Sequence, residues 1–175
     1  RLVPHKGIDT GIEVLACLAS AHPTLRYAIA GTGPDHDRLR ARAQALGVAD
    51  RVTFLGAVPP ADLPALYRSA TLYLALSRED GAEAEGFGLS IVEAEASGLP
   101  VIAGRSGGIS DAVMEGSTAL LVPPSDVSAV AESLGALLGD GDRRLAMGTA
   151  GRRLVEERLN WVRVVEDLRV AAESW

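Results

Sequence analysis

Short apolar runs alternate along the chain with longer stretches in which apolar residues recur at helical spacing. The apolar runs occupy residues 1–3, 25–30, 51–55, 71–76, 100–103 and 119–122. They are continuous, a pattern typical of parallel strands that are covered on both faces. The helical stretches between and after them occupy residues 8–21, 35–46, 60–69, 88–97, 108–114, 125–138, 142–158 and 161–174.

Strands that alternate with helices of this length indicate βαβ units with right-handed crossovers. The predicted fold is α/β: a Rossmann-like, doubly wound parallel sheet of six strands with helices on both faces, formed by residues 1–175 as one domain. Ligands of such sheets bind outside the carboxyl ends of the strands. The loops expected to carry the chemistry are 4–8, 31–35, 56–60, 77–88 and 104–108.

The first predicted strand begins abruptly at Arg1. A buried strand usually has about five residues, so several more are expected before it. The sequence therefore favours a chain that has been trimmed at this point, with a preceding domain absent.

Composition narrows the class of protein. Of the 175 residues, 47% are hydrophobic, 23% charged and 4% aromatic, which is typical of a globular domain with an aliphatic core. The net charge of −6 argues against a nucleic-acid partner. The one cysteine, Cys17, allows no intrachain disulfide and lies on an apolar stripe, where it is expected to be buried. No apolar run approaches the roughly 20 residues of a membrane-spanning helix.

The loop at 77–88 contains the strongest candidate chemistry. An acidic stretch leads into a phenylalanine flanked by glycines at 86–88, where the backbone turns and a helix opens. Helix N-termini with exposed N–H groups bind anions. Glu85 precedes this helix and Glu93 lies one turn inside it, with seven residues between them, so both can face one ligand. From spacing alone, a capping glutamate and a solvated glutamate remain the alternative.

Residues 85–93, EGFGLSIVE, resemble the E-x(7)-E motif of retaining glycosyltransferases of family 4, which have the GT-B fold. Further segments fit the same family: RLVPHKG at 1–7, AGTGP at 30–34, FLGAV at 54–58, AEASGLPVI at 94–102, SGGI at 106–109 and LLVPP at 120–124. The resemblance covers essentially the whole chain. It implies the C-terminal, donor-binding half of a GT-B enzyme.

The resemblance also implies a role for each residue of the motif. Glu85 would meet hydroxyls of the donor sugar, and Glu93 would accept hydrogen bonds from the ribose hydroxyls. The other contacts to the sugar and the diphosphate would come from the backbone N–H groups of Phe87, Gly88 and Leu89 and from the hydroxyl of Ser90.

Two cations would complete the implied site. Arg1 and Lys6 would neutralise the diphosphate leaving group, so that no metal is required. The base would pack near Gly31 and Gly33 and against the backbone around Val58. The implied substrate is a UDP-, GDP- or ADP-sugar, and no cofactor is expected.

Other kinds of cofactor site find no support in the sequence. Residues 31–33 lack the third glycine of a dinucleotide fingerprint, and no acidic ribose partner ends the next strand. The chain has no P-loop sequence, and no cluster of His, Cys and Asp has metal-ligand spacing. The histidines and tryptophans are expected at the surface (His5, His22 and His36) or as anchors of the terminal helix (Trp161 and Trp175).

The sequence departs from the family pattern between Ser77 and Glu85. Many members have a short Ser-x-x-Glu run, whereas here seven residues, 78–84, intervene. This lengthened loop loosely resembles that of mannosyltransferases that act on membrane lipids.

The function implied by the resemblance is retaining transfer of a hexosyl group from a sugar nucleotide to an acceptor hydroxyl. The acceptor and the remaining catalytic contacts would come from an N-terminal domain across a cleft, and this chain alone would bind nucleotide weakly and be inactive. The enzyme would be cytoplasmic, at the inner face of the membrane if that other half associates with lipid. Two alternatives stay open: a stand-alone nucleotide-binding regulatory module, and a sugar-nucleotide epimerase of the same two-lobed architecture.

Overall fold

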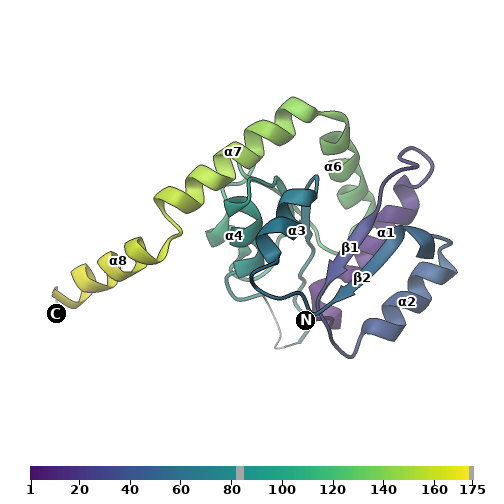
Figure 1. Cartoon of the computed structure of the whole chain (residues 1–175), viewed down its shortest axis with the longest axis horizontal. Coiled ribbons are helices and arrows are strands. Elements are labelled where there is room, and N and C mark those ends of the chain that lie inside the picture. Colours follow the sequence, from purple (N-terminus) through teal and green to yellow (C-terminus); the bar gives the residue numbers. More distant parts are fainter. Residues whose placement is uncertain (82–84, 174–175) are drawn as a thin grey trace.

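The chain forms two parallel β-sheets that helices pack against, and Figure 1 labels the strands of the first sheet and most of the helices. The structure is a computed structural model that describes residues 1–81 and 85–173, and of Asp167 the backbone only. The first sheet has the order β1-β2 and the second β3-β4-β5, with every pairing parallel, which confirms the predicted α/β class. The strands are β1 (Tyr27–Ala30), β2 (Val52–Gly56), β3 (Tyr73–Ala75), β4 (Val101–Gly104) and β5 (Ala119–Val122).

The helices follow the predicted order, and most are shorter than predicted by a few residues. A short 3-10 helix, Pro4–Lys6, precedes the first of them, and another, Ala49–Arg51, precedes β2. The α-helices are α1 (Ile8–Leu18), α2 (His36–Ala45), α3 (Leu63–Ser69), α4 (Leu89–Ala96), α5 (Ile109–Ala112), α6 (Val127–Gly139), α7 (Gly141–Glu157) and α8 (Trp161–Glu173). Asp126 and Asp140 begin α6 and α7 by accepting hydrogen bonds from backbone N–H groups inside the first turn.

The prediction of one sheet of six strands is wrong for the described part of the chain, which has five strands in two sheets. Residues 1–3 form no strand. The Leu2 N–H donates to the Thr32 carbonyl oxygen at 2.9 Å, and its own carbonyl oxygen accepts from Asp35 N–H at 3.2 Å. Both backbone polar groups of Leu2 are therefore hydrogen-bonded to the turn after β1. Pro4, which has no N–H and opens the 3-10 helix, prevents continuation of a ladder.

Helix α1 contributes side chains to the cores of both sheets. Its Ile12 and Leu15 pack with Ile29 and Leu39 on one face of the first sheet. Its Val14 belongs to a second cluster that covers one face of the other sheet. That second cluster also contains Ile102, Val122, Val130 and Leu134, so α1 and α6 share this face.

The second sheet is covered on both faces, as predicted, whereas the first is covered on one. Side chains of α4 and α5 pack on Val101 and Ala103 of β4, opposite the face that α6 covers, and every residue of β4 is buried. On the first sheet, the outward positions of β1 and β2 are exposed in the described chain. They are Ala28, Ala30, Thr53 and Leu55. The prediction of helices on both faces therefore holds only for the second sheet.

Two side chains predicted to be buried are exposed. Cys17 is exposed because it falls outside the inward-facing stripe of α1. That stripe runs from Val14 to the half-buried Leu18, and consecutive residues of a helix lie about 100° apart around its axis. Trp161 is 80% exposed. Helix α8 projects away from the rest of the protein (Figure 1), so its first residue has no core to enter. Trp175 lies outside the described residues.

Glu95 is a buried acid between α4 and α7. Its side chain is fully buried, and neither carboxylate oxygen has a hydrogen-bond partner among the residues that the structure describes. Burial raises the pKa of Glu95, and the nearby Thr118 hydroxyl only partly offsets this. The group is therefore protonated in the folded chain over a pH range in which it ionises in the unfolded chain. Folding stability is lost as the pH rises from about 4.5, the usual value for glutamate, through the raised pKa.

Glu95→Gln is expected to stabilise the fold at neutral pH by about 1–3 kcal/mol, because an amide does not ionise when buried. The gain should shrink as the pH falls towards and below 4.5, and below that value wild-type Glu95 becomes protonated in both states. Urea unfolding at several pH values measures both effects. The exposed Glu157→Gln on α7 is the control, and its effect is expected to stay within about 0.5 kcal/mol. A gain that is equal at all pH values would contradict the burial of an ionisable group here.

Candidate active site

The carboxyl ends of β1 and β3 meet the first ten residues of the chain. At one end, Leu2 is bonded to the turn after β1. At the other, the Arg78 N–H donates to the His5 carbonyl oxygen at 2.8 Å. Gly7 passes close to Leu76, and a Cβ at this glycine would overlap the Leu76 carbonyl oxygen. Gly7 also has φ +65°, so both its conformation and its surroundings require glycine.

Lys6, Ser77 and Glu85 form a polar constellation at this edge. The Lys6 ammonium lies 2.5 Å from Glu85 Oε2, and the Ser77 hydroxyl donates to the same oxygen at 2.8 Å. Burial alone would raise the pKa of Glu85. The hydrogen bonds from Lys6 and Ser77 and the charges of Lys6 and His5 outweigh burial and lower that pKa. The Glu85 carboxylate is therefore ionised and held in one orientation.

His5 is buried, with 4% of its surface exposed. The prediction that it is a surface residue is wrong, because the segment after β3 passes over it. His22 and His36, also predicted to face solvent, are each half-buried.

Glu93 lies on the exposed side of α4, where the Tyr67 hydroxyl donates to its Oε2 at 2.9 Å. The Tyr67 ring packs edge-to-face on Tyr73, with 5.7 Å between the ring centroids. Burial raises the pKa of Tyr67, and the neighbouring Tyr73 and the bond to Glu93 raise it further, so the hydroxyl keeps its proton. Sequence reasoning missed Tyr67, because nothing in its position in α3 signals a partner 26 residues further on.

The start of α4 has the geometry of an anion site. Gly88 precedes the helix with φ +80° and, as a glycine, provides no side-chain cap. The first N–H groups of a helix have no partner within it, and here they belong to Leu89 and Ser90. Phe87 and Leu89 are 40% and 67% exposed, respectively, so this helix start is open to solvent.

The backbone at Gly107 and Gly108 packs directly against the backbone of Glu85 and Gly86. A Cβ at Gly107 would overlap the Glu85 carbonyl oxygen, and one at Gly108 would overlap that of Gly86. The Gly108 N–H donates to the Glu85 carbonyl oxygen at 3.2 Å. This close backbone contact explains why the loop after β4 contains two consecutive glycines.

The residues predicted to surround the base lie at the end of the first sheet. Arg1 is exposed and its backbone lies beside Gly31, whereas Gly33 packs against the Leu2 backbone. The Gly31 N–H donates to the Gly56 carbonyl oxygen at 2.7 Å, two residues before the half-buried Val58. The predicted residues thus form two groups, one around Lys6 and Glu85 and one around this turn.

Two open cavities lie elsewhere. One, of about 370 Å³, is lined by residues of α2 and β2, including His36 and Phe54. The other, of about 350 Å³, lies between β5 and α6 and includes Glu115 and Glu132. Within residues 1–81 and 85–173, no group of three or more His, Cys, Asp or Glu side chains is placed to hold a metal ion. In the same residues, no helix is long and apolar enough to cross a bilayer.

Residues 1–154 match the family described as "Glycosyl transferases group 1". The GDP-mannose-dependent alpha-(1-6)-phosphatidylinositol monomannoside mannosyltransferase of Mycolicibacterium smegmatis is 40% identical over 163 residues, which cover 92% of this chain and 43% of that protein. The D-inositol 3-phosphate glycosyltransferase of Corynebacterium glutamicum is 42% identical over 154 residues, which cover 85% of this chain and 36% of that protein. The chain thus spans less than half the length of these relatives.

Solved structures agree with this assignment. Anabaena HepE in complex with UDP matches all of this chain and 47% of its own, with a TM-score of 0.88 and 26% identity. The C-terminal domain of LpcC, a group 1 glycosyl transferase family protein of Francisella tularensis, matches the fold with a TM-score of 0.80 and 24% identity over 92% of this chain and 83% of its own. The chain therefore belongs to the glycosyl transferase group 1 family, glycosyltransferase family 4, and corresponds to the C-terminal half of a GT-B enzyme.

Proposed function

We propose that this chain is the donor-binding half of a retaining mannosyltransferase that uses GDP-mannose. The constellation of Lys6, Ser77 and Glu85 beside the open start of α4 carries the proposal. The donor follows from the relatives that are about 40% identical over 92% of this chain, which are named for GDP-mannose and phosphatidylinositol mannosides. These names favour a transferase over an epimerase or a regulatory module.

Lys6 is proposed to neutralise the diphosphate. Both described bonds to the Glu85 carboxylate fall on Oε2, so Oε1 is available to accept a hydrogen bond from a sugar hydroxyl. The N–H groups at the start of α4 lie next to Glu85 in sequence and are proposed to face the phosphate oxygens. Arg1 is proposed to add a second cation from the other side. During transfer, the bond from the anomeric carbon to the diphosphate breaks, a bond to the acceptor oxygen forms, and the proton of the acceptor hydroxyl passes to the departing diphosphate. The cations stabilise the negative charge of that leaving group.

Glu93 is proposed to bind the ribose. Its Oε2 is oriented by the Tyr67 hydroxyl at 2.9 Å. Because each carboxylate oxygen has two lone pairs, Oε1 and the remaining site on Oε2 can still accept from two adjacent ribose hydroxyls. The base would then extend towards Gly31, Gly33 and Val58 at the end of the first sheet.

The acceptor and its contacts are proposed to belong to an N-terminal domain, because this chain covers 43% of its mannosyltransferase relative. The acceptor named for that relative, a phosphatidylinositol monomannoside, is a membrane lipid. The proposal therefore places the enzyme in the cytoplasm, at the inner face of the membrane. This chain alone is expected to bind nucleotide and to transfer no sugar.

Calorimetric titration of the chain with GDP, UDP and ADP tests the donor site. GDP is expected to bind most tightly, with a Kd roughly in the micromolar to millimolar range. Absence of binding to all three at millimolar concentration would exclude the site. Tighter binding of UDP or ADP would support a transferase and show that its donor is a UDP- or ADP-sugar instead of GDP-mannose.

Glu93→Ala is expected to weaken GDP binding by roughly 10–100-fold, because a charge-assisted bond to the ribose is lost. Glu85→Ala is expected to have little effect on GDP binding. GDP lacks the sugar that Glu85 is proposed to contact, and Lys6, released from its partner, can still bind the diphosphate. The exposed Glu79→Ala is the control for loss of an acid near the site. Calorimetry compares the three variants, and equal losses at Glu85 and Glu93 would contradict the division of roles.

A further inference from the structure

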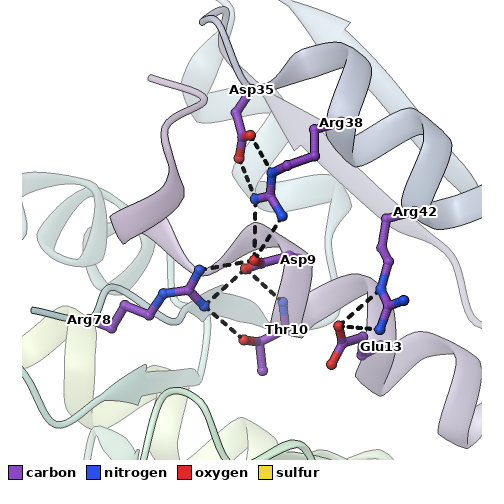
Figure 2. Close-up of polar contacts among 7 residues, drawn as sticks. All are labelled: Asp9, Thr10, Glu13, Asp35, Arg38, Arg42 and Arg78. Atoms are coloured by element: carbon purple, nitrogen blue, oxygen red, sulfur yellow. Dashed lines mark hydrogen bonds and ion pairs between the residues drawn. The ribbon is translucent and has the colours of Figure 1, made fainter. Parts of the chain in front are cut away.

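The Asp9 carboxylate accepts hydrogen bonds from two arginines that approach it from different parts of the chain (Figure 2). Arg78 contacts both oxygens, Nη1 with Oδ1 at 3.0 Å and Nη2 with Oδ2 at 2.9 Å. Arg38 contacts Oδ2 with both of its Nη atoms at 3.2 Å. The Asp9 side chain is 15% exposed. Burial alone would raise the pKa of Asp9, but the bonds and charges of Arg78 and the charge of Arg38 lower it, so the group is ionised.

The two arginines join Asp9 to the ends of both sheets. Arg78 follows β3 and is the first residue of the lengthened loop. Arg38 lies on α2, after β1, and is itself bound by the buried Asp35 at 2.5 and 2.6 Å (Figure 2). Asp9 is in the first turn of α1, three residues after Lys6. The network therefore connects the loops after β1 and β3 with the segment that contains Lys6.

The Asp9–Arg78 contact joins the start of α1 to the segment after β3. Lys6 and Ser77, which lie close to these two positions in the chain, both contact Glu85. Ser77 precedes Arg78 in the chain, and the Arg78 N–H is bonded to the His5 carbonyl oxygen. A guanidinium bound through two N–H groups to a carboxylate has one orientation, unlike an ammonium. With Arg78 held in this way, the Ser77 hydroxyl and the Lys6 ammonium both reach Glu85 Oε2.

We infer that Asp9 and Arg78 are positioning residues that set the geometry of Lys6, Ser77 and Glu85, and through them the recognition of the sugar end of the donor. Neither residue needs to touch the donor. The inference about donor recognition depends on the proposed function. The effect on Glu85 itself does not, and it is measurable without any ligand.

The chain offers a matched control in the Glu13–Arg42 pair. Arg42 donates to Glu13 Oε1 at 3.0 and 2.7 Å, and the pair joins α1 to α2 one turn further along (Figure 2). It thus resembles the Asp9–Arg38 contact but does not involve the segment after β3. Arg38→Gln is a second control, because it leaves the contact between Asp9 and Arg78 in place.

The test uses carbon-detected NMR of the Glu85 carboxyl in the wild-type chain and in Asp9→Asn, Arg78→Gln, Arg78→Lys, Arg42→Gln and Arg38→Gln. The pKa of Glu85 is expected to rise in the first two, to change partly in Arg78→Lys, and to stay unchanged in the two controls. Thermal unfolding of each variant confirms that it is folded. An unchanged pKa of Glu85 in folded Asp9→Asn and Arg78→Gln overturns the inference.

Titration of the same variants with GDP and GDP-mannose then tests the effect on the donor. Asp9→Asn and Arg78→Gln are expected to raise the Kd for GDP-mannose about tenfold and that for GDP by a smaller factor, because Lys6 is proposed to contact the diphosphate of both ligands whereas Glu85 is proposed to contact only the sugar. Equal losses for both ligands would overturn the assignment to the sugar end. If the wild-type chain binds neither ligand while the pKa of Glu85 shifts as expected, the positioning of Glu85 stands and the proposed function fails.

Discussion

Lys6→Met is expected to lower the rate of sugar transfer by about 100- to 1,000-fold in the longer enzyme that the proposed function requires, the range found when one group that stabilises developing charge is removed. Lys6 is proposed to neutralise the leaving group, and it also contacts Glu85 Oε2 at 2.5 Å. The substitution therefore removes charge neutralisation and releases a carboxylate next to a diphosphate. Release of GDP from GDP-mannose measures the rate.

Two further measurements identify the cause of that loss. In Lys6→Met, the pKa of Glu85 should rise, because its strongest hydrogen-bond donor is gone while its burial remains. Lys6→Arg keeps the positive charge and should recover part of the rate. A Lys6→Met enzyme with wild-type kcat would show that the diphosphate is neutralised elsewhere.

Gly148→Ala is expected to destabilise the fold by about 2–3 kcal/mol, as overpacking in a close helix contact does. Gly148 is buried on α7, and a Cβ there would overlap the carbonyl oxygen of Gly98, at the end of α4. A backbone atom cannot move aside as a flexible side chain can, so the two helices must separate. For a domain of this size the Tm should fall by roughly 5–10 °C, which calorimetry measures.

Gly141→Ala provides the comparison within the same helix. A Cβ at Gly141 would have within 4 Å only the Arg144 guanidinium, at 3.6 Å. Alanine also favours the helical backbone by up to about 1 kcal/mol. The Tm of this variant should stay constant or rise slightly. Equal stability of the two variants would contradict the close approach of α4 and α7.

Local patterns predicted the elements of the fold well. The bounds of β5 are those predicted, because a short apolar run between turn residues specifies a buried strand. Gly47 and Gly98 follow α2 and α4 with positive φ, as expected of residues that end helices. The sheet arrangement was not predictable in this way. Whether residues 1–3 pair with a strand depends on Leu2 and the turn at 32–35, which are far apart in sequence.

For the candidate site, the sequence named residues but not the contacts between them. The resemblance to the family led to the prediction that Lys6, Glu85 and Glu93 bind the donor. It gave no sign that Lys6 and Glu85, 79 residues apart, contact each other. Tyr67 was missed for the same reason. Contacts between distant segments leave no periodicity in a single sequence, so only the structure could reveal them.

Helix α8 differs from the other long helices in what supports it. Its side chains that the structure describes are all exposed, including the apolar Val162, Val165 and Leu168 at 63–79%. An isolated helix of 13 residues is only marginally stable in water. Its amide hydrogens should therefore exchange with solvent through local opening at a free energy near zero, whereas those of β4 exchange only when the whole domain unfolds. The chain is thus expected to unfold cooperatively up to the end of α7, and α8 is expected to open independently of that unit.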